Sequence, residues 1–198
     1  MYLPDAFAEN DPTRIAELVE RHPFATLISL DGTTTIVSHL PLLAEAGPSG
    51  TLSDGRLIGH LARANPHARL LEQDTLAIFH GPHAYISPRW YRSPGVPTWN
   101  YAAVHIRGQA RALSTPAETL RTVEKLTEAF ESDADSPWTP RAVSDRLEQL
   151  CSAIVAFEIS ITAIHAKFKL SQNRPPADQT AIRQALEQQA PALARLMP

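Results

Sequence analysis

The sequence predicts an α+β fold in which a mostly antiparallel β-barrel carries peripheral helices. Short β-rich runs follow one another along the chain, and amphipathic helical patterns separate them only at intervals. A doubly wound parallel sheet with a phosphate loop is not expected, because neither GxGxxG nor GxxxxGKS/T occurs. The chain has 198 residues, of which 43% are hydrophobic and 20% charged, and this is enough for one globular domain.

The N-terminal part of the chain is predicted to form a helix followed by a β-hairpin. Asp11 is a suitable N-cap and Pro12 a suitable first residue for a helix over residues 11–23, which carries apolar residues on one face. Residues 24–30 and 33–43 are β-rich runs on either side of an Asp-Gly pair, which tolerates the positive φ of a tight turn. These two runs are therefore expected to pair.

The middle of the chain is predicted to contain three further strands and one helix. The strands cover residues 56–61, 75–81 and 101–114, and the last of them nearly alternates apolar and polar residues. Between the first two strands, residues 62–72 are expected to be helical, with Asn65 as the cap and a proline after it. The short succession of strands favours antiparallel pairing.

A helix over residues 115–131 is predicted to pack on the outside of the sheet. It begins with a capping box, because Thr115 and Glu118 stand at its N-cap and N3 positions. Its expected apolar face consists of Leu120, Val123, Leu126 and Phe130.

The C-terminal part is predicted to contain a helix over residues 139–150, a long strand or pair of strands over residues 152–170, and a polar helix over residues 177–189. The one cysteine, Cys151, lies beside the apolar run of the predicted strand. A buried, unreactive thiol is therefore expected, and redox chemistry by this thiol is not.

Charge and composition limit the classes of function. The net charge of −3 and the pI near 6.2 give no overall basic field for unaided binding to nucleic acid. No apolar run approaches the roughly 20 residues of a membrane span, and the N-terminus lacks an export pattern, so we expect a cytoplasmic protein. The eight histidines show no HExxH or HxxxH spacing and the chain has no GxSxG, so neither a metal site nor a serine hydrolase is expected.

Two segments concentrate aromatic rings and hydrogen-bonding side chains: residues 80–91, HGPHAYISPRWY, and residues 96–105, VPTWNYAAVH. Their tyrosines and tryptophans are suited to line a planar ring. The segment 59–67, GHLARANPH, offers His60, Arg63 and the N–H groups of a helix start to an anion. The residues alone leave a second interpretation open, in which the rings pack a core and an interface while Arg63 faces water.

Seven segments occur in a characteristic order: MYLPDAF, HPFATLIS, SHLPLL, GHLARANPH, FHGPHAYISPRWY, VPTWNY and KFKLSQNR. This series resembles the FMN-binding negative transcriptional regulator family, the PaiB-type proteins. The resemblance implies a split β-barrel of the FMN-binding type over residues 1–174 and a C-terminal helix over residues 175–198, packed on the barrel or extending from it. Related split barrels include pyridoxine phosphate oxidases and flavin reductases, which usually bind FMN between two protomers. A homodimer with FMN at its seam is therefore implied.

The resemblance also implies which residues contact FMN. Ser38 and His39 are implied contacts of the isoalloxazine ring, because they lie on the strand whose edge meets it. His60, Arg63 and Asn65 occupy the place of the phosphate turn. Oxidase relatives carry an Arg-Lys pair where this chain has Asn65 followed by proline, so the positive charge at this turn is lower here.

Three further contacts are implied at the other side of the flavin. Asn100 is suited to the pyrimidine edge, whose carbonyls and N–H groups require matching partners. Lys169 and Gln172 are implied beside the N1–C2 carbonyl region, where they stabilise negative charge on a reduced flavin. A solvated strand end is the alternative for the segment 167–174. No catalytic residue and no metal ligand is implied.

Two function classes remain, together with a third interpretation. The first is a dimeric FMN-binding regulator, as the resemblance implies, and the second is an FMN-dependent oxidoreductase of the pyridoxine phosphate oxidase or flavin reductase type. Haem binding through a histidine, which occurs among barrel relatives, is the third. No helix-turn-helix with a basic recognition helix is evident, since residues 122–131 and 144–151 are acidic or neutral. DNA binding is therefore expected to be weak or indirect.

Overall fold

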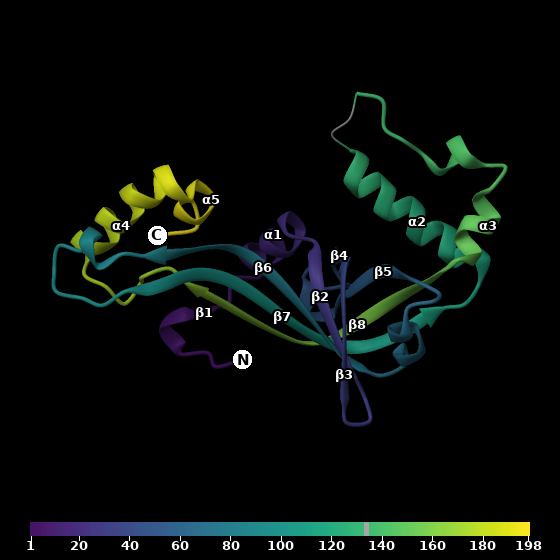
Figure 1. Cartoon of the computed structure of the whole chain (residues 1–198), viewed down its shortest axis with the longest axis horizontal. Helices are drawn as coiled ribbons and strands as arrows, with labels where there is room; N and C mark the ends of the chain where they lie inside the picture. The colour runs from purple at the N-terminus through teal and green to yellow at the C-terminus, as the bar shows by residue number, and fades with distance from the viewer. Residues whose placement is uncertain (133–134) are drawn as a thin grey trace.

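The centre of the protein is an eight-stranded antiparallel sheet in the computed structural model, which describes residues 1–132 and 135–198 (Figure 1). The strand order is β3-β2-β6-β7-β8-β5-β4, and β1 pairs with β8. The strands are β1 (Ala8–Glu9), β2 (Phe24–Asp31), β3 (Thr34–Pro41), β4 (Leu43–Glu45), β5 (Arg56–Ala62), β6 (Asp74–Ile86), β7 (Thr98–Leu113) and β8 (Ile154–Lys169). The α-helices are α1 (Pro12–Arg21), α2 (Pro116–Glu131), α3 (Leu147–Ser152), α4 (Pro176–Gln189) and α5 (Pro191–Ala194). Single turns of tighter helix are η1 (Asp5–Phe7), η2 (Leu52–Asp54), η3 (Pro66–Leu70), η4 (Pro88–Trp90) and η5 (Pro140–Val143).

The sheet closes into a barrel because β3 and β4 are consecutive in the chain but lie at its two opposite edges. Only Leu42 separates them. Its N–H donates to the carbonyl of Pro23 at 2.9 Å, and its side chain is 1% exposed. The chain thus steps from one edge of the sheet to the other, and the predicted antiparallel barrel is confirmed.

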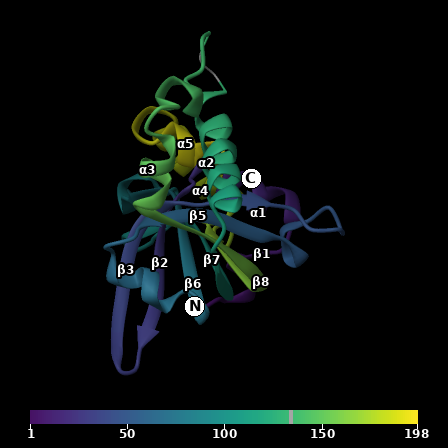
Figure 2. The same ribbon diagram turned by 90° about the vertical axis from the view of Figure 1, so that its right-hand side faces the viewer.

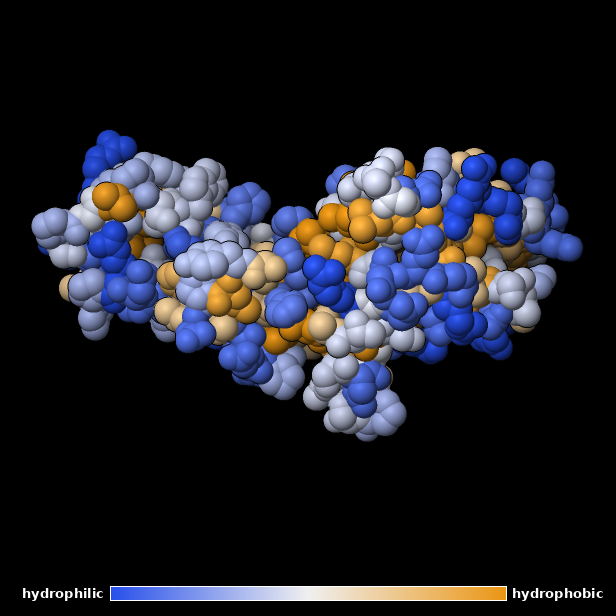
Figure 3. Space-filling model, turned by 90° about the horizontal axis from the view of Figure 1, so that it is seen from below, coloured by the Kyte–Doolittle hydropathy of each residue, from blue (hydrophilic) through white to orange (hydrophobic). Residues whose placement is uncertain are grey.

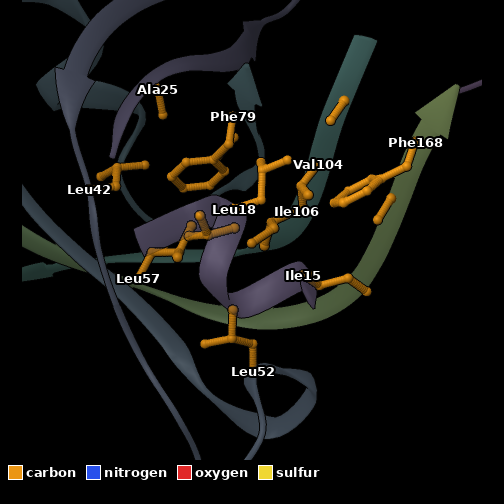
Figure 4. Close-up of a cluster of buried hydrophobic side chains, with 14 of the residues drawn as sticks. Ile15, Leu18, Ala25, Leu42, Leu52, Leu57, Phe79, Val104, Ile106 and Phe168 are labelled. Atoms are coloured by element: carbon orange, nitrogen blue, oxygen red, sulfur yellow. The ribbon is translucent and has the colours of Figure 1, made fainter. Parts of the chain in front are cut away.

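Strands β6, β7 and β8 are longer than the barrel and run on together to one end of the molecule (Figure 1). The helices α1, α4 and α5 lie along this extension, and α2 and α3 lie at the opposite end, which faces the viewer in Figure 2. One core joins the two parts. Phe79, Ile106 and Phe168 of the long strands are buried in it (Figure 4), together with Ile182 and Leu186 of α4.

Two predicted helix starts and the hairpin turn are confirmed. The carboxylate of Asp11 accepts from the N–H of Thr13 at 2.9 Å at the start of α1. At the start of α2, Thr115 Oγ1 accepts from the N–H of Glu118 at 3.2 Å, and the Glu118 carboxylate accepts from the N–H of Thr115 at 3.1 Å. These side chains satisfy donors that a helix leaves unpaired. Gly32 adopts a φ of +58° in the hairpin between β2 and β3.

Two other predicted helices are partly wrong. Residues 62–72 contain no α-helix, because β5 continues to Ala62 and only η3 follows, with Asn65 accepting from the N–H of His67 at 3.0 Å. The predicted helix over residues 139–150 is divided into η5 and α3, and α3 has no side-chain cap and no buried residue. Without tertiary packing, such a short segment gains little from continuing as one helix.

The predicted buried position of Cys151 is also wrong. This residue lies in α3, just before β8, and it is half-buried at the wall of a cavity.

Helix α2 packs on the outside of the sheet as expected, but its buried face is rotated from the predicted one and shares only Leu126 with it. Thr119, Thr122 and Leu126 are buried against β5 and β8, whereas Phe130 is 49% exposed. Thr122 tolerates burial because its hydroxyl donates to the carbonyl of Glu118 in the preceding turn at 3.0 Å.

The loop between β6 and β7 is attached to α4 by a buried carboxylate. Asp178 of α4 is fully buried and accepts three hydrogen bonds, from the N–H of Arg92 at 2.6 Å, the N–H of Ser93 at 3.0 Å and the hydroxyl of Ser93 at 2.6 Å. The hydroxyl of Ser93 makes the largest contribution to lowering the pKa of Asp178 below its ordinary value.

We expect Asp178→Asn to lower the midpoint of urea unfolding at pH 7, because three charge-assisted bonds become weaker or lose their acceptor. The lowered pKa means that this contribution is present above the ordinary pKa of aspartate and is lost as the pH falls through the pKa of the folded protein. The difference between the variant and the original protein should therefore vanish in acid. Asp145→Asn, at an exposed position, is the control and should leave the midpoint of unfolding unchanged at pH 7 and in acid. If the two substitutions lower the midpoint equally, the carboxylate of Asp178 does not hold the loop on α4.

Candidate functional site

The eight residues implied as flavin contacts fall into two groups on either end of β8. His60 pairs with Ala156 near the start of β8, and the rest of the first group lies in β3 and just after β5. Lys169 is the last residue of β8, where it pairs with Tyr101. At about 3.3 Å per residue, roughly 40 Å of strand separates Ala156 from Lys169. The first group comprises Ser38, His39, His60, Arg63 and Asn65, and the second comprises Asn100, Lys169 and Gln172.

Ser38 and Asn65 belong to a buried polar chain that also includes a histidine. Asn65 Nδ2 donates to Ser38 Oγ at 3.1 Å, and Ser38 Oγ lies 3.0 Å from His67 Nδ1. His67 Nε2 lies 3.0 Å from Ser29 Oγ. Beyond it, Ser29 donates to Thr75 Oγ1 at 2.9 Å and Thr75 to the carbonyl of Ile28 at 2.9 Å. This series of hydrogen bonds connects η3 to β2, β3 and β6.

The directions of these bonds fix the tautomer of His67. Because Ser29 uses its proton on Thr75, His67 Nε2 must carry the hydrogen that it shares with Ser29. His67 Nδ1 is then an acceptor, and Ser38 donates to it. His67 is fully buried, and this burial lowers its pKa. The proton of Ser38 is therefore engaged inside the barrel.

Sequence reasoning missed His67, although it is the last residue of the segment GHLARANPH. Its position after the Asn-Pro pair was available as a signal, since Asn65 caps the turn by accepting from the N–H of His67. What the sequence did not show is that this turn folds inward against Ser29 and Ser38.

His39 lies on the opposite face of β3 from Ser38 and is exposed. Its ring stacks with that of Phe24 at a centroid distance of 6.5 Å. Phe24, Leu30 and Val37 on β2 and β3 are exposed by 65%, 57% and 48%. Together they form an apolar outer surface on this hairpin, and apolar patches are also visible on the underside of the molecule (Figure 3).

His60 and Arg63 occupy different surroundings although they are close in sequence. His60 is half-buried, and its Nδ1 is buried without a hydrogen-bond partner among the described residues. Burial lowers the pKa of His60. Arg63 instead donates from Nε to the carbonyl of Ser152 and from Nη2 to that of Ile154, both at 2.7 Å. Its guanidinium is thus directed to the junction of α3 and β8.

The second group is built around the turn that follows β8. Asn100 is fully buried and exchanges hydrogen bonds with Ser171 at 2.9 Å and 3.1 Å. Gln172 accepts from the N–H of Leu170 at 2.6 Å and donates to the carbonyl of Phe168. Asn100 and Gln172 therefore stabilise this turn, in which Ser171 has a φ of +67°.

Lys169 is the cation of the second group. Its ammonium donates to Thr98 Oγ1 and to the carbonyl of Trp99, both at 2.6 Å, and this leaves one of its three N–H groups. Burial, followed by the charges of Lys167 and Arg174, lowers the pKa of Lys169. An anion placed here would be stabilised by a local excess of positive charge.

Exposed rings lie beside Lys169 on the paired ends of β6 and β7. Trp99 packs edge-on against Tyr85 at 6.1 Å and lies 6.3 Å from His83, yet Trp99 is 54% and Tyr85 47% exposed. The pairing shifts register between His80 and His83, at the position of the proline that cannot donate to the ladder. The segment 80–91 therefore divides: Tyr85 lies on the exposed end of β6, whereas Trp90 and Tyr91, at and just after η4, are partly buried and pack against the core.

Within the described residues, no group of three or more histidine, cysteine or acidic side chains is arranged to hold a metal ion. The same part of the chain contains no helix long and apolar enough to span a membrane.

Residues 1–163 match the model of a protein family described as "Putative FMN-binding domain". The chain is also 35% identical over 190 residues to "Protease synthase and sporulation protein PAI 2" of Bacillus subtilis (strain 168), a match that covers 94% of this chain and 89% of that relative.

Solved structures share the fold at much lower identity. An FAD and haem binding protein from Mycobacterium smegmatis superposes with a TM-score of 0.61 at 14% identity, covering 88% of this chain and 78% of the other. The flavocytochrome Anf3 from Azotobacter vinelandii gives a TM-score of 0.60 at 16% identity, covering 82% and 69%. The predicted split barrel of the flavin-binding type is confirmed at the level of the fold.

We expect His67→Gln to destabilise the protein by about 2–4 kcal/mol at pH 7.5, because buried hydroxyls of Ser29 and Ser38 lose their partner. The lowered pKa means that the original protein is fully stabilised above the ordinary histidine pKa and loses stability as the pH falls through the pKa of the folded state. Urea unfolding between pH 7.5 and pH 5 should therefore show a shallower loss for the variant.

Ser29→Ala is the matched control for this pH dependence. It removes one bond of His67 but keeps the buried imidazole, so the slope with pH should remain. If His67→Gln and the original protein lose stability in parallel, the buried imidazole does not set the pH dependence.

Proposed function

The chain belongs to this FMN-binding domain family, and on that basis we propose that it is an FMN-binding homodimer whose flavin lies between the two protomers. The observation that carries the proposal is the separation of the candidate contacts into two groups at opposite ends of β8. One flavin is too short to touch both groups of one chain. In a two-fold dimer, the second group of the partner can lie against the first group, and the site is then complete.

The residues present fit such a cofactor in four respects. The outer surface around His39 and Phe24 offers an exposed ring face, and the buried Nδ1 of His60 has no partner within the described residues. The other end offers the exposed ring of Trp99 and the remaining N–H of Lys169. When bound, FMN supplies hydride or electron transfer, and the cationic end stabilises its anionic parts.

We do not include Arg63, Ser38 and Asn65 among the direct flavin contacts of this proposal. Arg63 is bound to carbonyls at the junction of α3 and β8, and the polar atoms of Ser38 and Asn65 are engaged with His67 and with each other. Asn100 and Gln172 act by stabilising the turn beside Lys169. Their role is therefore to position the second group.

As to biological role, we propose a regulator that responds to FMN and acts in the cytoplasm through a partner. The support is the resemblance to PaiB-type negative regulators and the similarity to the PAI 2 protein. The half-buried single thiol is compatible with a reducing compartment. Direct contact with DNA is disfavoured because cations near α2 are already paired with carboxylates: Arg56 and Lys125 with Glu45, and Arg56 and Arg111 with Glu158.

A mixing experiment tests the shared site. We expect the double variant His39→Ala/His60→Ala and the single variant Lys169→Ala each to weaken FMN binding at least about tenfold. The double variant removes the contacts of the first group from both sites of the dimer, and Lys169→Ala removes those of the second group. When the two variants are unfolded together and refolded, half of the dimers should be mixed, and each mixed dimer should regain one intact site. FMN titration by flavin fluorescence should then recover about a quarter of the original sites.

Sedimentation of the original protein is the control and should give a dimer at micromolar concentration. If the mixture recovers no binding while both variants refold as dimers, the site lies within one protomer. If the original protein sediments only as a monomer, the dimer is excluded.

We expect no direct, selective binding to DNA. A mobility-shift titration of the FMN-loaded protein at about 150 mM salt should give a Kd weaker than about 1 μM, because the net charge is −3 and the cations near α2 are paired with carboxylates. Non-specific competitor should abolish any residual shift. A sequence-selective complex in the nanomolar range would contradict this expectation and favour a directly acting repressor.

A further inference from the structure

A cavity of about 700 Å³ lies between α2, α3 and the adjoining ends of β5, β7 and β8. Its volume is within the range of pockets that hold small organic molecules. The walls are mostly apolar, and the side chains that matter here are Arg63, Leu113, Leu120, Leu147, Cys151 and Val155. None of the flavin contacts proposed above lines it.

The helix that forms one wall of this cavity is weakly anchored. No residue of α3 is buried, and no side chain caps its N-terminus. Leu147 and Cys151 are only half-buried, and Leu150 is 43% exposed. A helix of this length depends on packing for its stability, so an apolar occupant that covers these side chains would stabilise it.

The lining of the cavity includes one cation, the exposed residue Arg63. The guanidinium of Arg63 is held by two neutral carbonyls at 2.7 Å, and no acidic side chain of the described residues forms an ion pair with it. Glu148 also lines the cavity, but it is exposed and makes no hydrogen bond in the same part of the chain. No hydrogen bond fixes its carboxylate, whereas two bonds hold the guanidinium of Arg63 in place, so the carboxylate opposes an anion only in part.

We propose that this cavity binds a small organic carboxylate with an apolar body. The body fills the space between α2 and α3, and the carboxylate lies beside the free N–H groups of Arg63. The site is separate from the flavin site, and binding here requires neither FMN nor the dimer.

The reaction of Cys151 reports on occupancy, because it is the one cysteine of the chain and lines the cavity. The probe is sodium decanoate, and decan-1-ol is the uncharged control of equal length. We expect decanoate, below its micellar concentration, to slow the reaction of Cys151 with a maleimide at least about fivefold in a saturable manner. Decan-1-ol should require a several-fold higher concentration, because it lacks the charge-assisted contact with Arg63.

Three variants decide the assignment. Leu120→Trp should abolish protection by both probes, since it fills the space, while FMN binding stays as in the original protein. Arg63→Met should weaken decanoate several-fold and leave decan-1-ol unchanged. Glu148→Gln should strengthen decanoate, because a repelling carboxylate is removed. Loss of structure would weaken decanoate binding in both variants, so weaker binding by Arg63→Met together with stronger binding by Glu148→Gln indicates an effect of charge.

The proposal is overturned if decanoate gives no saturable protection, or if it protects Leu120→Trp as well as the original protein. It is also overturned if Arg63→Met leaves decanoate binding unchanged. If that variant instead weakens FMN much more than riboflavin, Arg63 contacts the phosphate of FMN, and the cavity has no role in binding an anion.

Discussion

The backbone pairing of β8 is the interaction on which the rest of the structure depends. This strand pairs with β7 over most of its length, and its other edge pairs first with β5 and then with β1. Pairing with β7 along most of its length, and with β5 and β1 along parts of the other edge, keeps β8 extended from the barrel to the far end of the molecule. The distance between His60 and Lys169 is therefore set by main-chain geometry, which side-chain rotation cannot shorten. This is why we propose that a cofactor in contact with both groups bridges two chains.

Polar groups that have hydrogen-bond partners within the protein differ in role from those that have none. The first hold secondary-structure elements in place, and the second are open to a ligand. The side chains that are hydrogen-bonded in series from Asn65 through His67 to Thr75 are partners of one another. The same holds for Asn100 with Ser171 and for Asp178 with the loop before β7. Such groups hold elements in place and offer little to a ligand. What the chain leaves open are ring faces, a buried imidazole nitrogen and cations. These are the features that a flat, anionic molecule requires.

Local rules predicted the elements whose stability is local. Asp11 and the Thr115–Glu118 box begin helices because a side chain reaches the N–H groups of the next turn, which depends on sequence spacing alone. The antiparallel barrel followed from the succession of strands. Two other features depend on tertiary packing: which face of α2 is buried, and the division of residues 139–150 into two short helices. The local sequence pattern does not show which elements pack against these segments. The role of His67 also could not be predicted locally, because its two serine partners come from strands distant in sequence.

The proposed cavity and the proposed flavin site are connected through one short segment. Arg63 directly follows β5, which carries His60, and its guanidinium joins this strand end to the carbonyls of Ser152 and Ile154. The paired strands β5 and β8 resist displacement, whereas α3 has no buried residue and no side-chain cap. If the two sites are coupled, we expect the coupling to act through the ordering of α3 at this contact and not through movement of the sheet. By linkage, an occupant that orders α3 and changes the affinity for FMN must have its own affinity changed by FMN through the same factor.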